Sequence, residues 1–313
     1  MGSWNELLAE IHPKGKGHDL VRKRCLAELS SLTGRNVIVY YSGWLQKPQL
    51  RGVNGIRWDI NDADKEAFMA TIHGLDRTKG LDLFLHTPGG EIAAVESLID
   101  YLRAMFTDVR AVVPQIAMSG GTMIACSCEQ ILMGKQSSLG PIDPQIGGST
   151  PAHGIIEEFR RAQREIMKNP QRIPVWQPII AKYSPTLIGE CEKAIKWSQE
   201  IVRERLVKHM FKGRANAKAL AAKVVRELGD HALTKSHARH ISVARAEEIG
   251  LNIFRLEDDQ KLQDAVLSVH HACIITLSET ACCKLVENHN GVGQVQMVQM
   301  AAPAPQQPPP AKN

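Results

Sequence analysis

The 313-residue sequence lacks any stretch of about 18 to 20 consecutive apolar residues, the length that a membrane-spanning helix requires. We therefore expect no transmembrane segment. The first dozen residues also lack the basic region and the uninterrupted apolar run of a secretory signal peptide, because Glu6 and Glu10 interrupt them. From this we expect a protein that is not secreted.

The sequence also lacks a Cys-x-x-Cys pair, although it contains seven cysteines. An odd set without that spacing argues against a disulfide framework and against a zinc ribbon, so a reducing cytoplasm is the compartment we expect. Cys126 and Cys128 are interpreted as small buried hydrophobic residues rather than reactive thiols. No histidine is joined by cysteine or carboxylate ligands at zinc-site spacing, so we expect no metal and no cofactor.

Aromatic residues make up only 5% of the chain and the formal net charge is +5, so the composition does not require a nucleic-acid partner. The basic, alanine-rich stretch 203–226 is interpreted as a solvated helix face or a subunit contact. With 43% apolar and 23% charged residues the chain can bury a full core. We expect one large domain, or one domain with a modest appendage.

Between about residues 36 and 254 the sequence alternates short β-rich runs with helical segments, which is typical of a parallel sheet with crossover helices. The sequence therefore predicts an α/β fold. Irregular, polar residues from about 260 to 300 predict at most one short helix, and the Pro/Gln-rich tail 301–313 is expected to be disordered. The expected strands cover 37–41, 81–86, 109–114 and 130–133. The expected helices cover 62–75, 92–106, 122–128, 155–168, 187–210, 218–228 and 243–249.

Two motifs bear on the chemistry, and the first is Leu83-Phe-Leu-His-Thr-Pro-Gly-Gly-Glu91. It is interpreted as a strand that ends in a Pro-Gly-Gly turn and continues into a helix. Glycines at such a turn let backbone amides face a ligand, and the start of a helix favours negative charge. The motif outlines an oxyanion hole, although a Pro-Gly-Gly turn is also an ordinary way to end a strand.

The second motif is Val109-Arg-Ala-Val-Val-Pro-Gln-Ile-Ala-Met-Ser-Gly-Gly-Thr122, another buried strand that turns into a helix at Ser119. A serine at such an elbow can present its hydroxyl as a nucleophile, and the Gly120 amide can point at a developing oxyanion. The alternative is that Ser119 only caps the helix. Because turns that follow neighbouring parallel strands share one edge of the sheet, we expect the turn at Gly90 to lie beside Ser119.

The two turns and their separation resemble the Clp protease and crotonase superfamily. In the Clp peptidase a Pro-Gly-Gly turn and the residue after the nucleophilic serine supply the oxyanion amides, so the resemblance implies Ser119 as nucleophile with Gly90 and Gly120 as oxyanion donors. The resemblance continues through Gln136-Ser-Ser-Leu-Gly-Pro-Ile-Asp-Pro-Gln-Ile and closes at Ile241-Ser-Val-Ala-Arg-Ala-Glu-Glu-Ile-Gly-Leu. The Ser-Leu-Gly-Pro-Ile-Asp-Pro-Gln run most resembles the serine dehydrogenase proteinase group, which is related to signal peptide peptidase.

This resemblance implies a spiral of repeated strand-strand-helix units with additional helices. On that basis we expect an N-terminal helical segment at 1–35, a Clp/crotonase-like catalytic domain at 36–256 and a C-terminal extension at 257–300. The superfamily usually forms rings or stacked oligomers, so a homo-oligomer that acts on a peptide or protein is expected. Nucleic acid is not expected as a partner.

The resemblance leaves the general base open. Asp143 stands where the Clp peptidase keeps its catalytic histidine, and a carboxylate is a weak base toward a serine hydroxyl unless burial raises its pKa. Signal peptide peptidases and their small archaeal-type relatives resemble a Ser/Lys dyad instead, in which a desolvated lysine accepts the proton. The candidate lysines are Lys196 first, Lys182 second and Lys168 third.

An exchanged triad is a further alternative, because His237 falls near the place of the Clp triad acid. A triad is defined by geometry and not by chain order, so Ser119, His237 and Asp143 could form one. Asp143 could equally be only the first residue of an Asp-Pro turn.

The leading hypothesis is a serine endopeptidase that uses Ser119, the oxyanion amides of Gly90 and Gly120, and a lysine base. Cleavage of peptide bonds, as opposed to small esters or thioesters, follows from the resemblance alone. A crotonase-like acyl-CoA enzyme, which uses the same oxyanion hole without a serine, and a catalytically idle scaffold subunit are the two alternatives.

Overall fold

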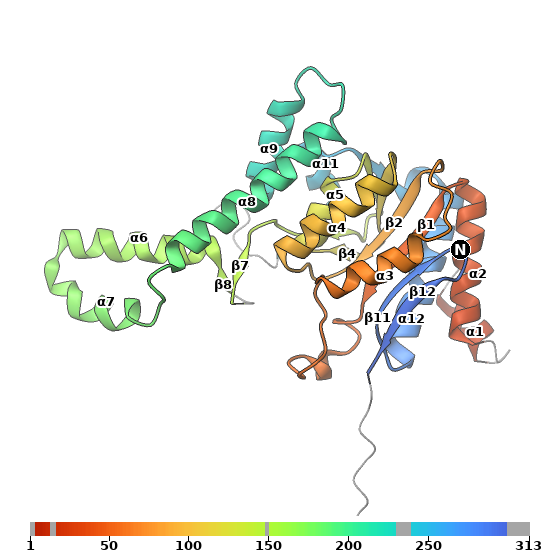
Figure 1. Ribbon diagram of the computed structural model, residues 1–313, viewed down its shortest axis with the longest axis horizontal. Coiled ribbons are helices and arrows are strands. Elements are labelled where there is room, and N and C mark those ends of the chain that lie inside the picture. Colours follow the sequence, from red (N-terminus) through yellow and green to blue (C-terminus); the bar gives the residue numbers. More distant parts are fainter. Residues whose placement is uncertain (1–3, 13–16, 148–149, 230–238, 299–313) are drawn as a thin grey trace, which may run out of the picture.

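The computed structural model describes residues 4–12, 17–147, 150–229 and 239–298. At its centre lies a seven-stranded mixed sheet with the order β10-β5-β3-β2-β1-β11-β12 (Figure 1). Neighbours from β10 to β1 are parallel, whereas β11 and β12 are antiparallel to their neighbours. The expected strands are confirmed to within one residue at each end. The strands of this sheet are β1 (Asn36–Ser42), β2 (Leu81–His86), β3 (Val109–Val113), β5 (Gln130–Met133), β10 (Ile253–Arg255), β11 (Cys282–Asn288) and β12 (Gly293–Met297).

Helices cover both faces of the sheet and bury a hydrophobic cluster on each. Along β1 the side chains alternate, with Val37 and Val39 in one cluster and Ile38 and Tyr40 in the other. The first cluster is covered by α1 (Trp4–Ile11), α2 (His18–Thr33) and α12 (Gln260–Glu279). The second is covered by α3 (Ala63–Ile72), α4 (Ile92–Met105), α5 (Gly120–Cys126), α8 (Leu187–Lys208), α9 (Ala217–Gly229) and α11 (Val243–Ile249).

The expectation of at most one short helix after residue 260 was wrong, whereas the strands expected before residue 254 do pair in parallel. α12 is 20 residues long, and β11, a strand that was not expected, pairs antiparallel with β1. β11 contains charged residues that are buried in the fold, so its sequence does not look like a buried strand. The partners of these charged residues lie far away in the sequence. Lys284 Nζ lies 3.0 Å from Asp64 Oδ1, and Glu287 accepts a 2.6 Å hydrogen bond from Arg22.

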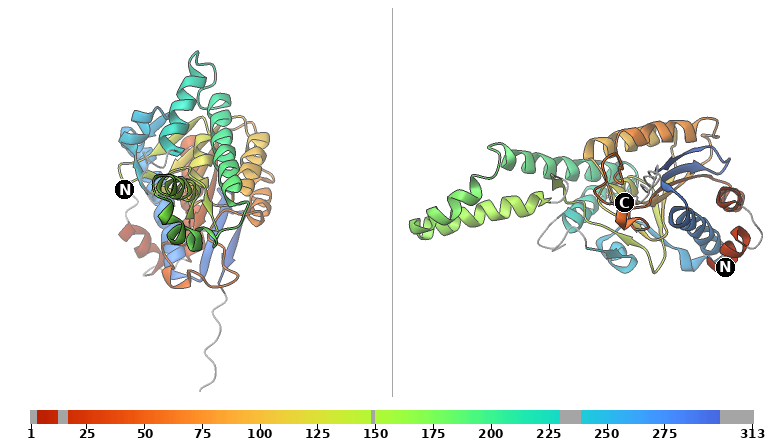
Figure 2. Two further views of the ribbon diagram at one scale, coloured as in Figure 1. Left: turned by 90° about the vertical axis from the view of Figure 1, so that its left-hand side faces the viewer. Right: turned by 90° about the horizontal axis from the view of Figure 1, so that it is seen from below.

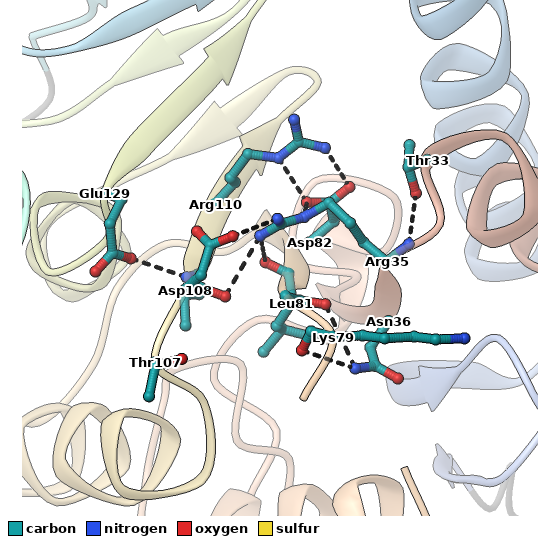
Figure 3. A network of polar contacts seen from close by, with 12 residues as sticks. Thr33, Arg35, Asn36, Lys79, Leu81, Asp82, Thr107, Asp108, Arg110 and Glu129 are labelled. Atoms are coloured by element: carbon teal, nitrogen blue, oxygen red, sulfur yellow. Dashed lines mark hydrogen bonds and ion pairs between the residues drawn. The ribbon is translucent and has the colours of Figure 1, made fainter. Parts of the chain in front are cut away.

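A buried carboxylate joins the amino ends of three neighbouring strands (Figure 3). Asp82 on β2 is only 1% exposed and accepts hydrogen bonds from Arg35 Nε at 2.7 Å and from Arg110 Nη2 at 2.7 Å. Arg35 immediately precedes β1 and also pairs with Asp108 at the start of β3. These ion pairs fix the relative positions of β1, β2 and β3, and therefore of the turns that leave their carboxyl ends.

A helical arm projects from the body of the protein (Figures 1 and 2). It consists of α6 (Ala152–Lys168), α7 (Ile173–Ile180) and the first part of α8, and α6 packs on α8 through a small apolar cluster that includes Ile155 and Leu187. Trp197 on α8 donates a 2.9 Å hydrogen bond to Glu96 on α4, which ties the base of the arm to the body. The remaining short strands are β4 (Ile116–Ala117), β6 (Ser138–Leu139) and β9 (Ile241–Ser242) in one small sheet, and the hairpin of β7 (Gln145–Ile146) with β8 (Thr150–Pro151).

Candidate active site

The two motifs meet at the carboxyl ends of β2 and β3. Thr87, which follows β2, forms a parallel bridge with Ala117, and its carbonyl accepts a 3.0 Å hydrogen bond from the Met118 amide. The Pro-Gly-Gly turn therefore lies directly against the strand end that carries Ser119. A Cβ added at Gly89 would lie 2.7 Å from Ser119 Cβ, so only glycine fits at that contact.

Ser119 has an unusual backbone conformation. Its φ of +47° and ψ of −111° make it the one non-glycine residue with positive φ in the described part of the chain. Such a conformation costs about 1 to 3 kcal/mol, and it persists only where the surrounding structure imposes it. Ser119 precedes α5 but its side chain makes no capping hydrogen bond, and the residue is half-buried. Its hydroxyl is thus not used to cap the helix.

Two backbone amides beside Ser119 are available to a ligand. Within the described ranges, neither the Gly90 nor the Gly120 amide donates a hydrogen bond to another group of the protein. A Cβ added at Gly120 would lie 3.1 Å from the Gly90 nitrogen, so the two amides are close neighbours. Ile60 holds the turn in place, because its amide donates to Gly89 and its carbonyl accepts from Glu91.

A cavity of about 660 Å³ opens at this point, between the body and the base of the arm. One side of it is charged, with Arg57 paired to both Asp59 and Glu91. The other side is largely apolar and includes Trp197 of α8. The cavity is lined by Arg57, Asp59, Pro88, Gly89, Gly90, Glu91, Ile92, Ala93, Ser119, Met123, Ile142, Pro144, Gln145, Ile146, Ala194 and Trp197.

A carboxylate in the loop that lines the cavity lies near an imidazole of α6. Asp143 is fully buried, between Ile142 and Pro144, which both line the cavity. Its Oδ1 lies 3.9 Å from Nε2 of His153, which is 25% exposed at the start of α6. The β7–β8 hairpin brings His153 back to this loop, and the Ala152 amide donates a 2.9 Å hydrogen bond to the Pro144 carbonyl.

Sequence reasoning missed His153, because nothing in the sequence alone pairs it with Asp143. The signal that could have found it is the Gly147-Gly148 pair, which predicts a tight turn between the two residues. An α6 start at Ala152, three residues earlier than expected, puts the imidazole on the first turn of the helix.

The candidate lysines lie away from the cavity. Lys196 is on α8, with its side chain 77% exposed and its Nζ 3.7 Å from Glu200 Oε1. Lys182 and Lys168 are exposed as well, and within the described chain no lysine lines the cavity. A lysine base needs desolvation, which these positions do not provide in the single chain. His237 lies outside the described residues.

Besides the serine, the cysteines near Ser119 and the possible metal ligands of the chain bear on the chemistry of this site. Cys126 and Cys128 on α5 and its end are buried, as expected, and burial raises the pKa of the Cys126 thiol to about 12. In the residues with a described structure, no cluster of three or more His, Cys, Asp or Glu side chains could hold a metal ion. No helix in that same set is both long enough and apolar enough to cross a membrane.

The mixed α/β fold and the serine elbow beside two free amides define the class as a Clp-like serine proteinase fold. The sequence model of the ClpP-like SDH-type serine proteinases matches residues 7–261, and the chain belongs to that family. The resemblance drawn from the two motifs is thereby confirmed.

The chain is also similar to three other proteins. An uncharacterized protein of Methanocaldococcus jannaschii is 30% identical over 236 residues, which cover 75% of this chain and 73% of the relative. A second uncharacterized protein of that organism is 28% identical over 232 residues, covering 74% and 71%. The ATP-dependent Clp protease proteolytic subunit of Streptococcus sanguinis is 38% identical over 52 residues, covering 17% of this chain and 26% of the subunit.

Proposed function

We propose that this chain is a serine endopeptidase in which Ser119 attacks the carbonyl carbon of a peptide bond. The observation that carries the proposal is the strained elbow at Ser119, which presents an uncapped hydroxyl to a cavity and lies beside two glycine amides without acceptors. Strain of this kind is retained where it serves to orient a reacting group.

In the first step a bond forms between Ser119 Oγ and the carbonyl carbon, and the hydroxyl proton passes to the general base. The carbonyl oxygen becomes an oxyanion that accepts hydrogen bonds from the Gly90 and Gly120 amides. The C–N bond then breaks, and the base returns the proton to the leaving amine. Water attacks the acyl ester in the same way and releases the second product with free Ser119.

We assign the base to His153, held and polarised by Asp143. An imidazole can accept the serine proton at neutral pH, and a buried carboxylate beside it stabilises the imidazolium that forms. The 3.9 Å separation of His153 Nε2 from Asp143 Oδ1 supports this pairing. The lysine dyad with Lys196, Lys182 or Lys168, and the triad with His237, stay as competing predictions.

Turnover of an unfolded protein substrate tests the proposal. Ser119→Ala should abolish cleavage of casein, because the elbow then carries no nucleophile. The melting temperature should stay at or above the wild-type value. Ser31→Ala is the matched control, since Ser31 is exposed on α2 on the other face of the sheet. Cleavage retained by Ser119→Ala would overturn the proposal.

The two alternative functions predict different results in the same assay. A crotonase-like enzyme should act on an acyl-CoA thioester and keep that activity in Ser119→Ala, because its chemistry needs only the oxyanion amides. A catalytically idle scaffold should cleave neither substrate.

A further inference from the structure

Within the described residues, one edge of the central sheet is formed by β12, which has a neighbouring strand on one side only. β12 pairs with β11 on one side and is the last strand in the order of the sheet. The Asn288 amide donates to the Val292 carbonyl and the Val298 amide donates to the Ala281 carbonyl, so the even-numbered backbone groups face β11. By the alternation of an antiparallel ladder, the N–H and C=O groups of Gly293, Val295 and Met297 face away from it.

Charged side chains and proline, two features that commonly protect an edge strand from pairing, are absent from this stretch of the sequence. Natural edge strands are shielded by charged side chains or proline. Residues 290–300 contain no Asp, Glu, Lys, Arg or Pro. Two large apolar side chains of this short strand are exposed, Val295 at 40% and Met297 at 57%, and Val292 just before it is 46% exposed.

Two hollows flank β12, one on each face of the sheet. The hollow of about 470 Å³ lies between Gln296 and the loop that contains Val53 and Ile56. The hollow of about 410 Å³ lies between Val295 and α2, where Leu20 is 65% exposed. Side chains of a strand alternate between the two faces, so a strand added beside β12 would place side chains on the sides of both hollows.

We infer that β12 pairs antiparallel with β12 of a second copy of this chain, about a two-fold axis perpendicular to the sheet. Under this symmetry the face of one strand meets the same face of its partner. Val295 and Met297 line one face of β12, and Gln294 and Gln296 line the other. Apolar side chains would therefore meet apolar ones, and glutamine amides, which donate and accept, would meet amides.

Because this edge has no charged side chain, we favour a second copy of the chain as its partner over a charged peptide. With no formal charge between residues 290 and 300, self-pairing creates no like-charge repulsion, and nothing at the edge selects a charged peptide. The pairing would join two seven-stranded sheets into one continuous sheet. This inference concerns the assembly of the chain and does not depend on the proposed peptidase chemistry.

The sedimentation mass of the full-length chain tests this inference. Val295→Lys places a charge where it would face its own copy, so we expect the mass to fall to half the wild-type value. Val175→Lys is the matched control, because Val175 is 54% exposed on the arm and makes no part of the edge. An unchanged mass in Val295→Lys, or a wild-type chain that sediments as a monomer, would overturn the inference.

Hydrogen exchange gives a second measurement that needs no substitution. The outward amides of Val295 and Met297 should exchange slowly at concentrations where the wild-type chain is assembled and quickly after dilution to the smaller species. Slow exchange that persists after dissociation would mean that the chain covers its own edge. Fast exchange in the assembled state would mean that assembly uses another surface, and either result would contradict the pairing.

Discussion

His153 Nε2 lies 3.9 Å from Asp143 Oδ1, and the β7–β8 hairpin is what brings the two residues together. In the proposed triad Asp143 supplies the carboxylate, and His153, which follows it in the chain, supplies the base. Ile142 and Pro144, the two neighbours of Asp143 in the chain, line the same cavity as Ser119.

Replacement of His153 tests the assignment of the base. His153→Ala should lower kcat by about two to four orders of magnitude, the usual contribution of general acid–base catalysis. In the wild-type enzyme kcat/KM should rise through the neutral range as an imidazole loses its proton. Lys196→Met should retain turnover, because that side chain is 77% exposed and pairs with Glu200.

A lysine dyad predicts the reverse pattern. Activity would then rise only in the alkaline range and would be lost in Lys196→Met, Lys182→Met or Lys168→Met, with His153→Ala active. If His237→Ala is inactive and His153→Ala is not, the triad uses His237.

The substitution Gly120→Ala tests the oxyanion hole, because it adds a methyl group beside the backbone amide and removes no side chain. A Cβ at this position would lie 2.6 Å from Val95 Cγ2, so Gly120→Ala should displace the amide and lower kcat by about 10² to 10³. Val95→Ala removes the clashing methyl, and the double variant should recover part of the lost turnover while Val95→Ala alone stays active. Full activity in Gly120→Ala would show that the amide is not a donor. Gly90 is less suitable, because a Cβ there would lie 2.2 Å from the Ile60 carbonyl oxygen and disturb the turn itself.

His86 should make the protein sensitive to acid. Burial lowers the pKa of His86 to about 3 in the folded chain, against about 6.5 for an ordinary histidine. Between these values the unfolded chain binds a proton that the folded chain does not, so the free energy of unfolding falls as the pH drops from about 6.5 to 3. His86→Phe should flatten this fall in thermal melts, and His73→Phe, at an exposed position, should not. The account of His86 is wrong if both variants follow the wild-type pH curve.

Asp82 should contribute to the stability of the fold and not to the catalytic step. Asp82→Asn leaves two arginines beside a neutral amide, and breaking a buried ion pair costs about 3 to 5 kcal/mol. Asp108→Asn is the control, because Asp108 is 51% exposed and such a pair contributes at most about 1 kcal/mol. Denaturant unfolding compares the two, and equal losses of stability would contradict the role given to Asp82.

The parallel half of the sheet and the meeting of the two turns could be predicted from the sequence. β1, β2, β3 and β5 are short apolar runs that are buried on both faces, and glycines mark the turns that follow β2 and precede α5. These signals are local, since each strand and the turn that ends it are contiguous.

The C-terminal strands and the base could not be predicted, because their signals are not local. Lys284 and Glu287 read as surface residues until Asp64 and Arg22 are placed beside them by the fold. His153 became a candidate only once the hairpin returned it to Asp143. The exposure of Lys196 depends likewise on which face of α8 packs on the body, and the spacing of apolar residues did not settle that.

The most direct test of the account is to map the site of covalent modification by a fluorophosphonate. Intact-protein mass spectrometry of the wild-type chain should show one added phosphonyl group, and peptide mapping should place it on Ser119. His153→Ala should be labelled much more slowly and Ser119→Ala not at all. A label on any other residue, or unchanged labelling of Ser119→Ala, would contradict the claim that Ser119 is the nucleophile.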